Sequence, residues 1–161
     1  MKLIVAMDKN GGIGYNGQLP WNCPEDMKHF RETTIGNTVI MGYRTYLSLN
    51  KKPLKDRFCV VYDSDFTEPC QQNGFIFTDS IKNVDMASKI SKNFGKESYV
   101  IGGAKTYNIF MIYGLISELI VTHIHSEHIC DTFFDIPKGW EVTEEEFLSE
   151  RATVKRYAKS S

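Results

Sequence analysis

The sequence predicts an α/β fold built on a mixed, mainly parallel sheet with helices on both faces. Short apolar runs rich in β-branched residues alternate with segments of helical periodicity, which is typical of strand–helix–strand units. The last third of the chain is dominated by strand patterns, which indicates antiparallel additions to the sheet. The length of 161 residues suits a single domain over 1–161.

Glycine and proline set the expected boundaries in the first half of the chain. Pro24 suits the first turn of a helix and Gly36 its end, while the glycine-rich segment before Pro24 predicts a mobile lid. The expected elements are a strand at 2–8, a loop at 9–21, a helix at 24–34, a strand at 37–41, a short helix at 43–49 and a strand at 58–62.

The second half continues the alternation. Val84, Ala87, Ile90 and Phe94 recur at helical spacing, which predicts a helix with one apolar face ending at Gly95. The expected elements are strands at 75–77, 98–101 and 117–125, helices at 83–94 and 104–113, and antiparallel edge strands at 131–134 and 153–158.

Composition excludes several classes of protein. The formal net charge of -1 provides no basic field for nucleic acid. The apolar run at 3–7 is too short to span a membrane, and no secretory leader is recognisable, so a cytoplasmic location is expected. Cys23, Cys59, Cys70 and Cys130 show no metal-type spacing and are expected to be reduced thiols, with Cys59 as a small core residue.

Two segments echo each other: Val39–Tyr46 (VIMGYRTY) and Val100–Tyr107 (VIGGAKTY). Each predicts a buried strand that turns at glycine into a helix, followed by a cation and a threonine. Helix N-termini offer free N–H groups and a positive dipole end, which suit phosphate. Such junctions are also common as plain connectors, but the matched pair favours a ligand with two phosphates, such as a dinucleotide.

Asp26 is the most informative ionisable residue. It falls in the first turn of the helix after Pro24, beside Met27 and one turn before Phe30. Two interpretations stay open: an acid favoured by the helix dipole, as Glu25 is, or a carboxylate that faces an apolar cleft and is partly desolvated.

Three histidines, His123, His125 and His128, lie close together near Cys130. His123 and His125 would share one strand face, but the spacing matches no metal motif, so a polar strand surface is the better interpretation and no metal site is predicted. The Gly11–Gly14 segment lacks the order of a dinucleotide fingerprint, and no nucleophile elbow or Walker loop is present.

A further set of motifs is spread from near the start of the chain to about residue 158. They are Ile13-Gly14, Leu19-Pro20-Trp21-Asn22 with Pro24 and Asp26, Phe30, Val39-Ile40-Met41-Gly42 with Thr45, Pro53-Leu54 with Arg57, Val100-Ile101-Gly102-Gly103 with Tyr107, Thr122-His123-Ile124, and Asp131-Thr132-Phe133-Phe134. With this set the chain resembles the dihydrofolate reductase family.

The resemblance implies a mixed, mainly parallel eight-stranded sheet flanked by four helices. It implies an adenosine-binding subdomain at about 38–106 and a loop subdomain formed by the remainder. The implied reaction is oxidoreduction of 7,8-dihydrofolate to 5,6,7,8-tetrahydrofolate with hydride from NADPH, a step of one-carbon metabolism. Dihydrofolate and antifolate-type small molecules are the implied ligands, with no nucleic acid and no membrane as partners, and a monomer is expected.

The resemblance also implies roles at the substrate. Asp26 would hold the pterin and support protonation at N5, with Trp21 and Thr122 completing the catalytic set. Arg57 would clamp the glutamate carboxylate of folate, which a planar guanidinium suits. The other residues implied at the substrate are Ile4, Val5, Met27, Phe30, Leu49, Leu54 and Ile101.

At the cofactor, the two echoing junctions would cradle the pyrophosphate, and Gly102–Gly103 would carry the family's cis peptide. The residues implied there are Ala6, Ile13, Gly14, Asn16, Gly17, Leu19, Gly42, Tyr43, Arg44, Thr45, Tyr62, Asp63, Ser64, Ile101, Gly102, Gly103, Ala104, Lys105, Thr106 and Tyr107.

Some positions depart from the family pattern. Tyr43 and Asp63 stand where a cation and a serine usually face the 2′-phosphate of NADPH. A carboxylate repels a phosphate but accepts a hydrogen bond from a free 2′-hydroxyl, so use of NADH beside NADPH is expected, with Arg44 and Ser64 as neighbours that compensate. Leu19 replaces a methionine common in bacterial members.

Two other functions stay open. A related pteridine reductase with another substrate tail would have no use for Arg57. A binding or assembly protein that has lost catalysis would not need Asp26, Trp21 and Thr122.

Overall fold

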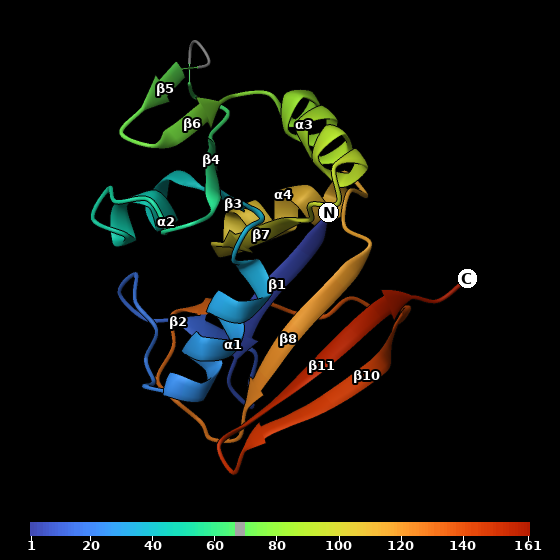
Figure 1. The fold of residues 1–161 in the computed structure, drawn as a ribbon. Coiled ribbons are helices and arrows are strands. Elements are labelled where there is room, and N and C mark those ends of the chain that lie inside the picture. Colours follow the sequence, from blue (N-terminus) through green and yellow to red (C-terminus); the bar gives the residue numbers. More distant parts are fainter. Residues whose placement is uncertain (67–69) are drawn as a thin grey trace.

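The computed structural model describes residues 1–66 and 70–161. The strands of its main sheet are β1 (Lys2–Met7), β3 (Thr38–Met41), β4 (Phe58–Tyr62), β5 (Cys70–Gln72), β6 (Phe75–Thr78), β7 (Ser98–Gly102), β8 (Glu118–Ile124), β10 (Trp140–Ser149) and β11 (Ala152–Lys159). Among these described residues they form a nine-stranded sheet in the order β10-β11-β8-β1-β7-β3-β4-β6-β5 (Figure 1). The neighbours from β8 to β6 are parallel, and the two outer edges are antiparallel.

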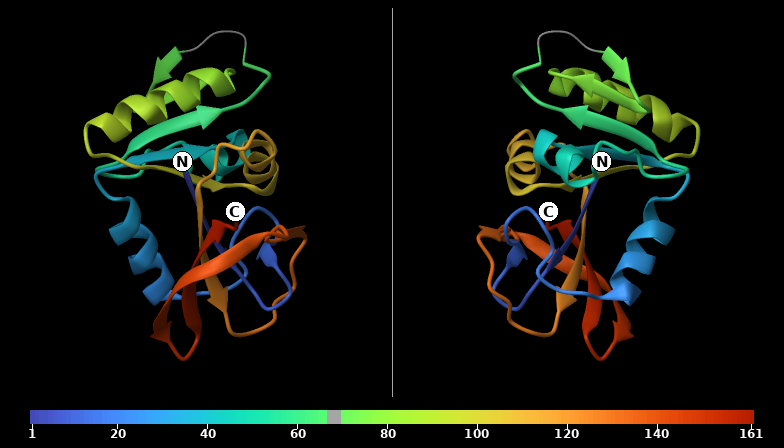
Figure 2. Two further views of the ribbon diagram at one scale, coloured as in Figure 1. Left: turned by 90° about the vertical axis from the view of Figure 1, so that its right-hand side faces the viewer. Right: turned by 90° about the vertical axis from the view of Figure 1, so that its left-hand side faces the viewer.

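The helices are α1 (Pro24–Thr34), α2 (Tyr43–Ser48), α3 (Ile81–Asn93) and α4 (Ala104–Ile112). The crossovers that contain α1 and α2 run toward β6, whereas those of α3 and α4 run back toward β8. Because parallel crossovers are right-handed, the two pairs lie on opposite faces. Figure 2 shows α1 beside the β10–β11 hairpin and α3 beside β6 at the far end of the sheet.

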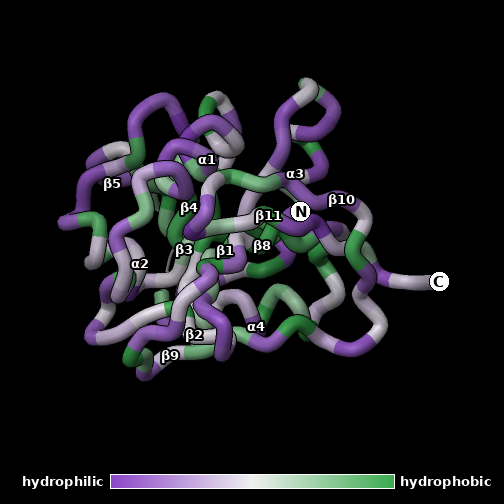
Figure 3. The backbone as a smooth tube through the Cα atoms, turned by 90° about the horizontal axis from the view of Figure 1, so that it is seen from below, coloured by the Kyte–Doolittle hydropathy of each residue, from purple (hydrophilic) through white to green (hydrophobic). Residues whose placement is uncertain are grey.

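The core follows from the alternation of side chains along these strands. Leu3 and Val100 pack against Phe110 of α4, while Met41 and Val61 pack against Tyr46 of α2 on the other face. The most hydrophobic stretches of backbone run through the central strands, and hydrophilic stretches lie at the periphery (Figure 3). The predicted mixed α/β class with helices on both faces is confirmed.

The expected edges of the sheet are partly wrong. β9 (Thr132–Phe133) does not join the main sheet but pairs with β2 (Gly12–Gly14) in a small second sheet. The true edge is β10, which the sequence analysis missed because its acidic, exposed residues at 144–146 hide the strand alternation. At the other edge the short hairpin strand β5 brings the strand count to nine instead of eight in the described chain.

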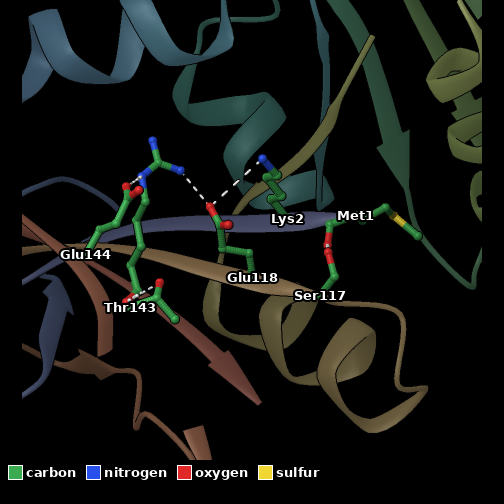
Figure 4. Close-up of polar contacts among 7 residues, drawn as sticks. Met1, Lys2, Ser117, Glu118, Thr143 and Glu144 are labelled. Carbon is green, nitrogen blue, oxygen red and sulfur yellow. Dashed lines mark hydrogen bonds and ion pairs between the residues drawn. The ribbon is translucent and has the colours of Figure 1, made fainter. Parts of the chain in front are cut away.

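Ion pairs connect the strands near the β10 edge (Figure 4). Glu118 of β8 accepts from Arg156 Nη1 at 2.6 Å and lies 3.9 Å from Lys2 Nζ. Arg156 Nε lies 3.4 Å from Glu144. The pairs are partly exposed, so each contributes about 1 kcal/mol or less, and together they link β1, β8, β11 and β10.

Helix α3 differs from expectation in its orientation. Of the four residues expected on its apolar face, only Val84 is buried, and Ile90 and Phe94 are 54% and 79% exposed. Ala87 is exposed as well. The predicted helix is therefore confirmed, but its predicted buried face is wrong. No helix in the described part of the chain has the length and hydropathy needed to cross a membrane.

Candidate active site

The buried carboxylate of Asp26 is the centre of the candidate site. α1 begins at Pro24 and places Asp26 in its first turn, against β8. Thr122 of β8 is buried and donates from Oγ1 to Asp26 Oδ1 at 2.6 Å. The hydrogen bond expected between these residues, 96 positions apart, is therefore present. Of the two interpretations of Asp26, the structure supports the desolvated carboxylate.

Burial raises the pKa of Asp26 above its ordinary value, although the hydrogen bond from Thr122 works in the opposite direction. His29, one turn further along α1, also favours the ionised form of Asp26. Burial in turn lowers the pKa of His29, whose Nε2 has no hydrogen-bond partner among the described residues. His29 is not among the residues predicted from sequence, although its i+3 spacing from Asp26 could have indicated it.

Apolar side chains form a wall on the same face of the sheet as Asp26. Phe30 and Ile101 pack against the buried cluster that contains Ile4 of β1. Ile101, Leu49 and Leu54 pack against a neighbouring buried cluster that contains Met41 and Tyr46. The wall is open to a ligand because four of its side chains are only half-buried: Phe30, Leu49, Leu54 and Ile101.

Three other predicted neighbours of the wall differ in placement. Ala6 faces the same side as Ile4 and pairs in register with Thr122. Val5 points to the opposite face, where it packs with the α4 core, so only its backbone can contact a ligand on the Asp26 side. Met27 is 63% exposed on α1 and does not share the buried environment of Asp26.

Trp21 lies just before α1 and packs against His128, with ring centroids 5.4 Å apart. Its Nε1 is buried and lacks a hydrogen-bond partner within residues 1–66 and 70–161, so this donor is available to a ligand or a water molecule. Trp21 also adjoins a cavity of about 300 Å³ with Cys23, His125 and Arg151, but Asp26 does not line that cavity.

Arg57 lies just before β4, at the far end of the apolar wall. Its Nη1 donates to Thr34 Oγ1 at 3.2 Å, its Nε donates to the carbonyl of Lys55, and its guanidinium lies 6.0 Å from the centre of the Phe30 ring. No carboxylate pairs with Arg57 in the described parts of the chain. Its charge is therefore available to an anionic group of a ligand.

The two echoing junctions lie side by side because β3 and β7 are neighbours. Gly42 N donates to the carbonyl of Gly102 at 2.9 Å. A Cβ on Gly42 would collide with Oγ1 of Thr106, and a Cβ on Gly102 would lie 3.4 Å from Oγ1 of Thr45. The threonine of each junction thus packs against the glycine of the other, which accounts for the repeated pattern.

This paired junction fits a diphosphate. The peptide between Gly102 and Gly103 is cis, as the resemblance implied. Gly103 is the N-cap of α4, and no side chain of the described residues caps this helix, so the first-turn N–H groups at Ala104 and beyond can bind an anion. Arg44 and Lys105 are exposed in the first turns of α2 and α4 and supply positive charge.

Two tyrosines expected at the cofactor are engaged within the protein. Tyr107 is buried and donates from its hydroxyl to the carbonyl of Ile4 at 2.7 Å, and burial together with the charge of Asp26 raises its pKa. Tyr62 is buried in the core against Phe110. Both side chains lie in the core that underlies the site.

The two residues that depart from the family pattern, Tyr43 and Asp63, lie near the surface at the end of β4 and the start of α2. Tyr43 is partly exposed and packs against Tyr46 and Phe66. Asp63 follows β4, and its Oδ1 accepts from the backbone N–H of Asp65 at 2.9 Å, while Ser64 is exposed. The carboxylate of Asp63 is therefore held within its own turn.

The glycine-rich segment is more ordered than a plain loop. Gly12 and Gly14 pair with β9, Asn16 and Gly17 form an exposed turn, and Asn16 N donates to Asp131 Oδ2 at 3.0 Å. Ile13 packs against the core, whereas Leu19 is exposed.

Asp8 anchors this segment and was missed by the sequence analysis. Oδ1 accepts from the backbone N–H groups of Gly12 and Asn10, and Oδ2 accepts from that of His128. Burial alone would raise the pKa of Asp8, but these three hydrogen bonds outweigh it and lower the pKa. The signal available in the sequence was an Asp at the end of an apolar strand, just before the glycines of a loop whose N–H groups it could bind.

The histidines make hydrogen bonds within the protein. His123 Nε2 lies 2.8 Å from the hydroxyl of Tyr157, and His125 contacts the carbonyl of Glu150 and the hydroxyl of Thr153. His128 pairs with Ser126. In the described residues no cluster of three metal-ligating side chains occurs.

Comparisons with known proteins agree with this geometry. A family model described as dihydrofolate reductase matches residues 1–159. The dihydrofolate reductase of Buchnera aphidicola subsp. Acyrthosiphon pisum is 39% identical over 134 residues, which is 83% of this chain and 78% of that protein. The enzyme of Ureaplasma parvum serovar 3 is 32% identical, covering 84% and 82%.

Among solved structures, a dihydrofolate reductase from Enterococcus faecalis complexed with NADP(H) and RAB-propyl superposes with a TM-score of 0.78 at 28% identity, covering 99% of this chain and 96% of that chain. The match extends over the paired junctions and the Asp26 site alike. The chain belongs to the dihydrofolate reductase family.

Proposed function

We propose that Asp26 is the acidic group through which this enzyme reduces 7,8-dihydrofolate to 5,6,7,8-tetrahydrofolate, the reaction of its family. The observation that carries the proposal is the buried Asp26 carboxylate, bonded to Thr122 beside a half-buried apolar wall. Within such a wall, a carboxylate of raised pKa binds a heterocycle by charge-assisted hydrogen bonds and shares a proton with it. Asp26 thereby binds the pterin amino group and ring N–H and supports protonation at N5.

The other substrate roles follow from position. Trp21 offers its free Nε1 to the pterin or to a water molecule beside it. Phe30, Leu49 and Leu54 hold the benzoyl region by apolar contact. Arg57, which has no ion-pair partner among the described residues, binds the glutamate carboxylate. That free guanidinium favours a folate over a pteridine without an acidic tail.

NADPH supplies the hydride when bound. The paired junctions of Gly42 and Gly102–Gly103 would hold its pyrophosphate, since glycine permits close approach of a ligand to the backbone. Ala6 and Ile101 frame the position where pterin and nicotinamide meet, and the segment at 13–19 covers it. The solved relative from Enterococcus faecalis, complexed with NADP(H), supports this cofactor.

NADH is also a usable cofactor of this enzyme in our proposal. Arg44 is the cation left beside the 2′ position, and Asp63 is a carboxylate in the same region. The preference for NADPH is then only about 10-fold, because a single exposed charge contact contributes about 1 kcal/mol or a little more.

The proposed organisation is a single-domain monomer with an adenosine-binding subdomain at about 38–106 and a loop subdomain formed by the remainder. A cytoplasmic location is supported by the free thiols of Cys23, Cys59, Cys70 and Cys130. Antifolate-type inhibitors are expected to compete with dihydrofolate at Asp26.

One assay tests the function. Oxidation of NADPH, followed by absorbance, should depend on added dihydrofolate and should persist more weakly with NADH. The Asp26→Asn variant should lose this activity while still binding NADPH. Full activity of that variant at neutral pH would contradict the role of Asp26, and no turnover by the unaltered protein would support a purely binding function.

A further inference from the structure

A cavity of about 280 Å³ lies between α3 and the sheet, on the face opposite α1 and Asp26. Its floor is one face of the parallel strands β6, β4, β3 and β7, where Ile40 and Val60 form the centre and Ser98 one end. Its roof is the inner side of α3. Val84 of α3 is buried in the core beside the cavity, and Ile81 at the start of the helix packs against the same core.

The cavity exists because α3 presents small residues to the sheet. Ala87, Ser88 and Ser91 line the roof, whereas the larger Met86 and Ile90 of the same helix are exposed. Small side chains opposite a flat floor leave the volume between them unfilled. Because Phe58, Asn83 and Ala87 of the lining are exposed, this space is partly open to solvent and a ligand can enter it.

Ser98 provides an independent sign that something binds here. It is 2% exposed, yet its hydroxyl has no hydrogen-bond partner within the described residues. Along β7 its side chain lies on the same face as Val100, which packs in the α3–α4 core, so the hydroxyl is on the cavity side. A buried hydroxyl without a partner is costly, and a ligand that bonds to it removes that cost.

The lining also defines the chemistry of the occupant. None of the residues around the cavity carries a charge, and the centre of the floor is apolar while Thr38 and Ser98 lie at one end and Thr78 and Asn83 at the other. A charged ligand would find no counter-ion among the lining residues and would lose part of its hydration. The volume is roughly twice that of an engineered cavity of about 150 Å³ that binds benzene in another protein.

We propose that this α3 cavity is a second binding site, which takes a small, neutral, flat ring system whose hydrogen-bonding atom pairs with Ser98. A bicyclic heterocycle with about ten non-hydrogen atoms matches the size. At the usual efficiency of small ligands its dissociation constant is on the order of 0.1–1 mM.

Quinoline and naphthalene are matched probes, because they have the same shape and only quinoline has a ring nitrogen that accepts a hydrogen bond. In NMR titrations of the unaltered protein, quinoline should give saturable shifts and ligand-to-methyl NOEs at Ile40, Val60 and Val84. Ser98→Ala should weaken quinoline by about 2- to 10-fold and leave naphthalene unchanged.

Substitutions on α3 complete the test. Ser88→Leu fills the cavity and should abolish NOEs from both probes, while Lys82→Leu, at an exposed position of the same helix, should leave them intact. The proposal is overturned if the unaltered protein shows no NOEs to Ile40, Val60 or Val84, as a water-filled cavity would, or if NOEs arise only at Ile4 and Ile120 beside Asp26. It is equally overturned if Ser88→Leu folds and still binds both probes.

Discussion

Replacing Asp26 with Asn tests whether the buried carboxylate destabilises the folded protein when it is ionised. Because burial raises the pKa of Asp26 in the folded protein, the native state binds more protons than the unfolded chain between the ordinary pKa of 3.8 and the raised value. The stability contributed by the protonated carboxyl is therefore present at low pH and is lost as pH rises through that interval. The Asn side chain never ionises and avoids this loss.

The expected effect grows with pH. Each unit by which the pKa of Asp26 is raised corresponds to about 1.4 kcal/mol in the free energy of unfolding. For a domain of this size, about 1 kcal/mol shifts Tm by roughly 2–4 °C. The Tm of Asp26→Asn, measured relative to the unaltered protein, should therefore be more favourable at pH 8 than at pH 4.5.

Thermal unfolding at both pH values measures this difference. Any pH-independent effect of the new amide cancels, since only the change between the two pH values is compared. Glu25→Gln is a matched control on the same helix turn, and its Tm difference from the unaltered protein should stay nearly constant between pH 4.5 and pH 8. A hydrogen bond from Ser149 is the main cause that lowers the pKa of Glu25 to about 2, so its stabilisation is present above pH 4.5 and is lost toward pH 2. A pH-independent Tm difference for Asp26→Asn would refute the desolvation reasoning.

Further predictions concern the rest of the site. At pH 7, Asp26→Asn should lower kcat by about 10²–10⁴-fold in the absorbance assay and leave the NADPH dissociation constant largely unchanged. Arg57→Leu should raise the KM for dihydrofolate by about 10- to 100-fold and affect a pterin without glutamate much less; equal losses would assign Arg57 a structural role. Asp63→Ser should increase the NADPH/NADH ratio of kcat/KM and Arg44→Ala should decrease it; an unchanged ratio for Asp63→Ser would place Asp63 away from the 2′ position. Prolonged chelation should leave activity intact, and a retained equivalent of zinc found by elemental analysis would contradict this.

The order of the elements could be predicted from sequence because each depends on local signals. α1 begins at Pro24 and ends at Thr34 as expected, and β4 has the predicted bounds. Which face a helix turns inward depends on the sheet beneath it, and α3 shows that apolar spacing alone does not decide it. β10 was missed for a related reason: its exposed, acidic residues make no apolar alternation, and its pairing with β11 alone makes it a strand.

At the site, too, local sequence signals predict which residues matter, and tertiary packing decides their environment. The motifs could indicate Asp26 and Thr122 as partners, but the burial that decides between a surface acid and a desolvated one comes from β8, far along the chain. Val5 was assigned to the substrate by motif position, yet the strand alternation turns its side chain to the opposite face. Tyr107 likewise uses its hydroxyl within the protein, which a linear pattern does not reveal.

The echo between the two junctions has a physical basis in the sheet. β3 and β7 are adjacent, so Thr45 packs against Gly102 while Thr106 packs against Gly42. A side chain at Gly42 would displace Thr106 and, with it, the first turn of α4. The steric constraint is therefore strong at Gly42, whereas a Cβ on Gly102 would meet Thr45 at an ordinary contact distance of 3.4 Å. These contacts join the two junctions, and the proposed binding of a pyrophosphate rests on their lying side by side.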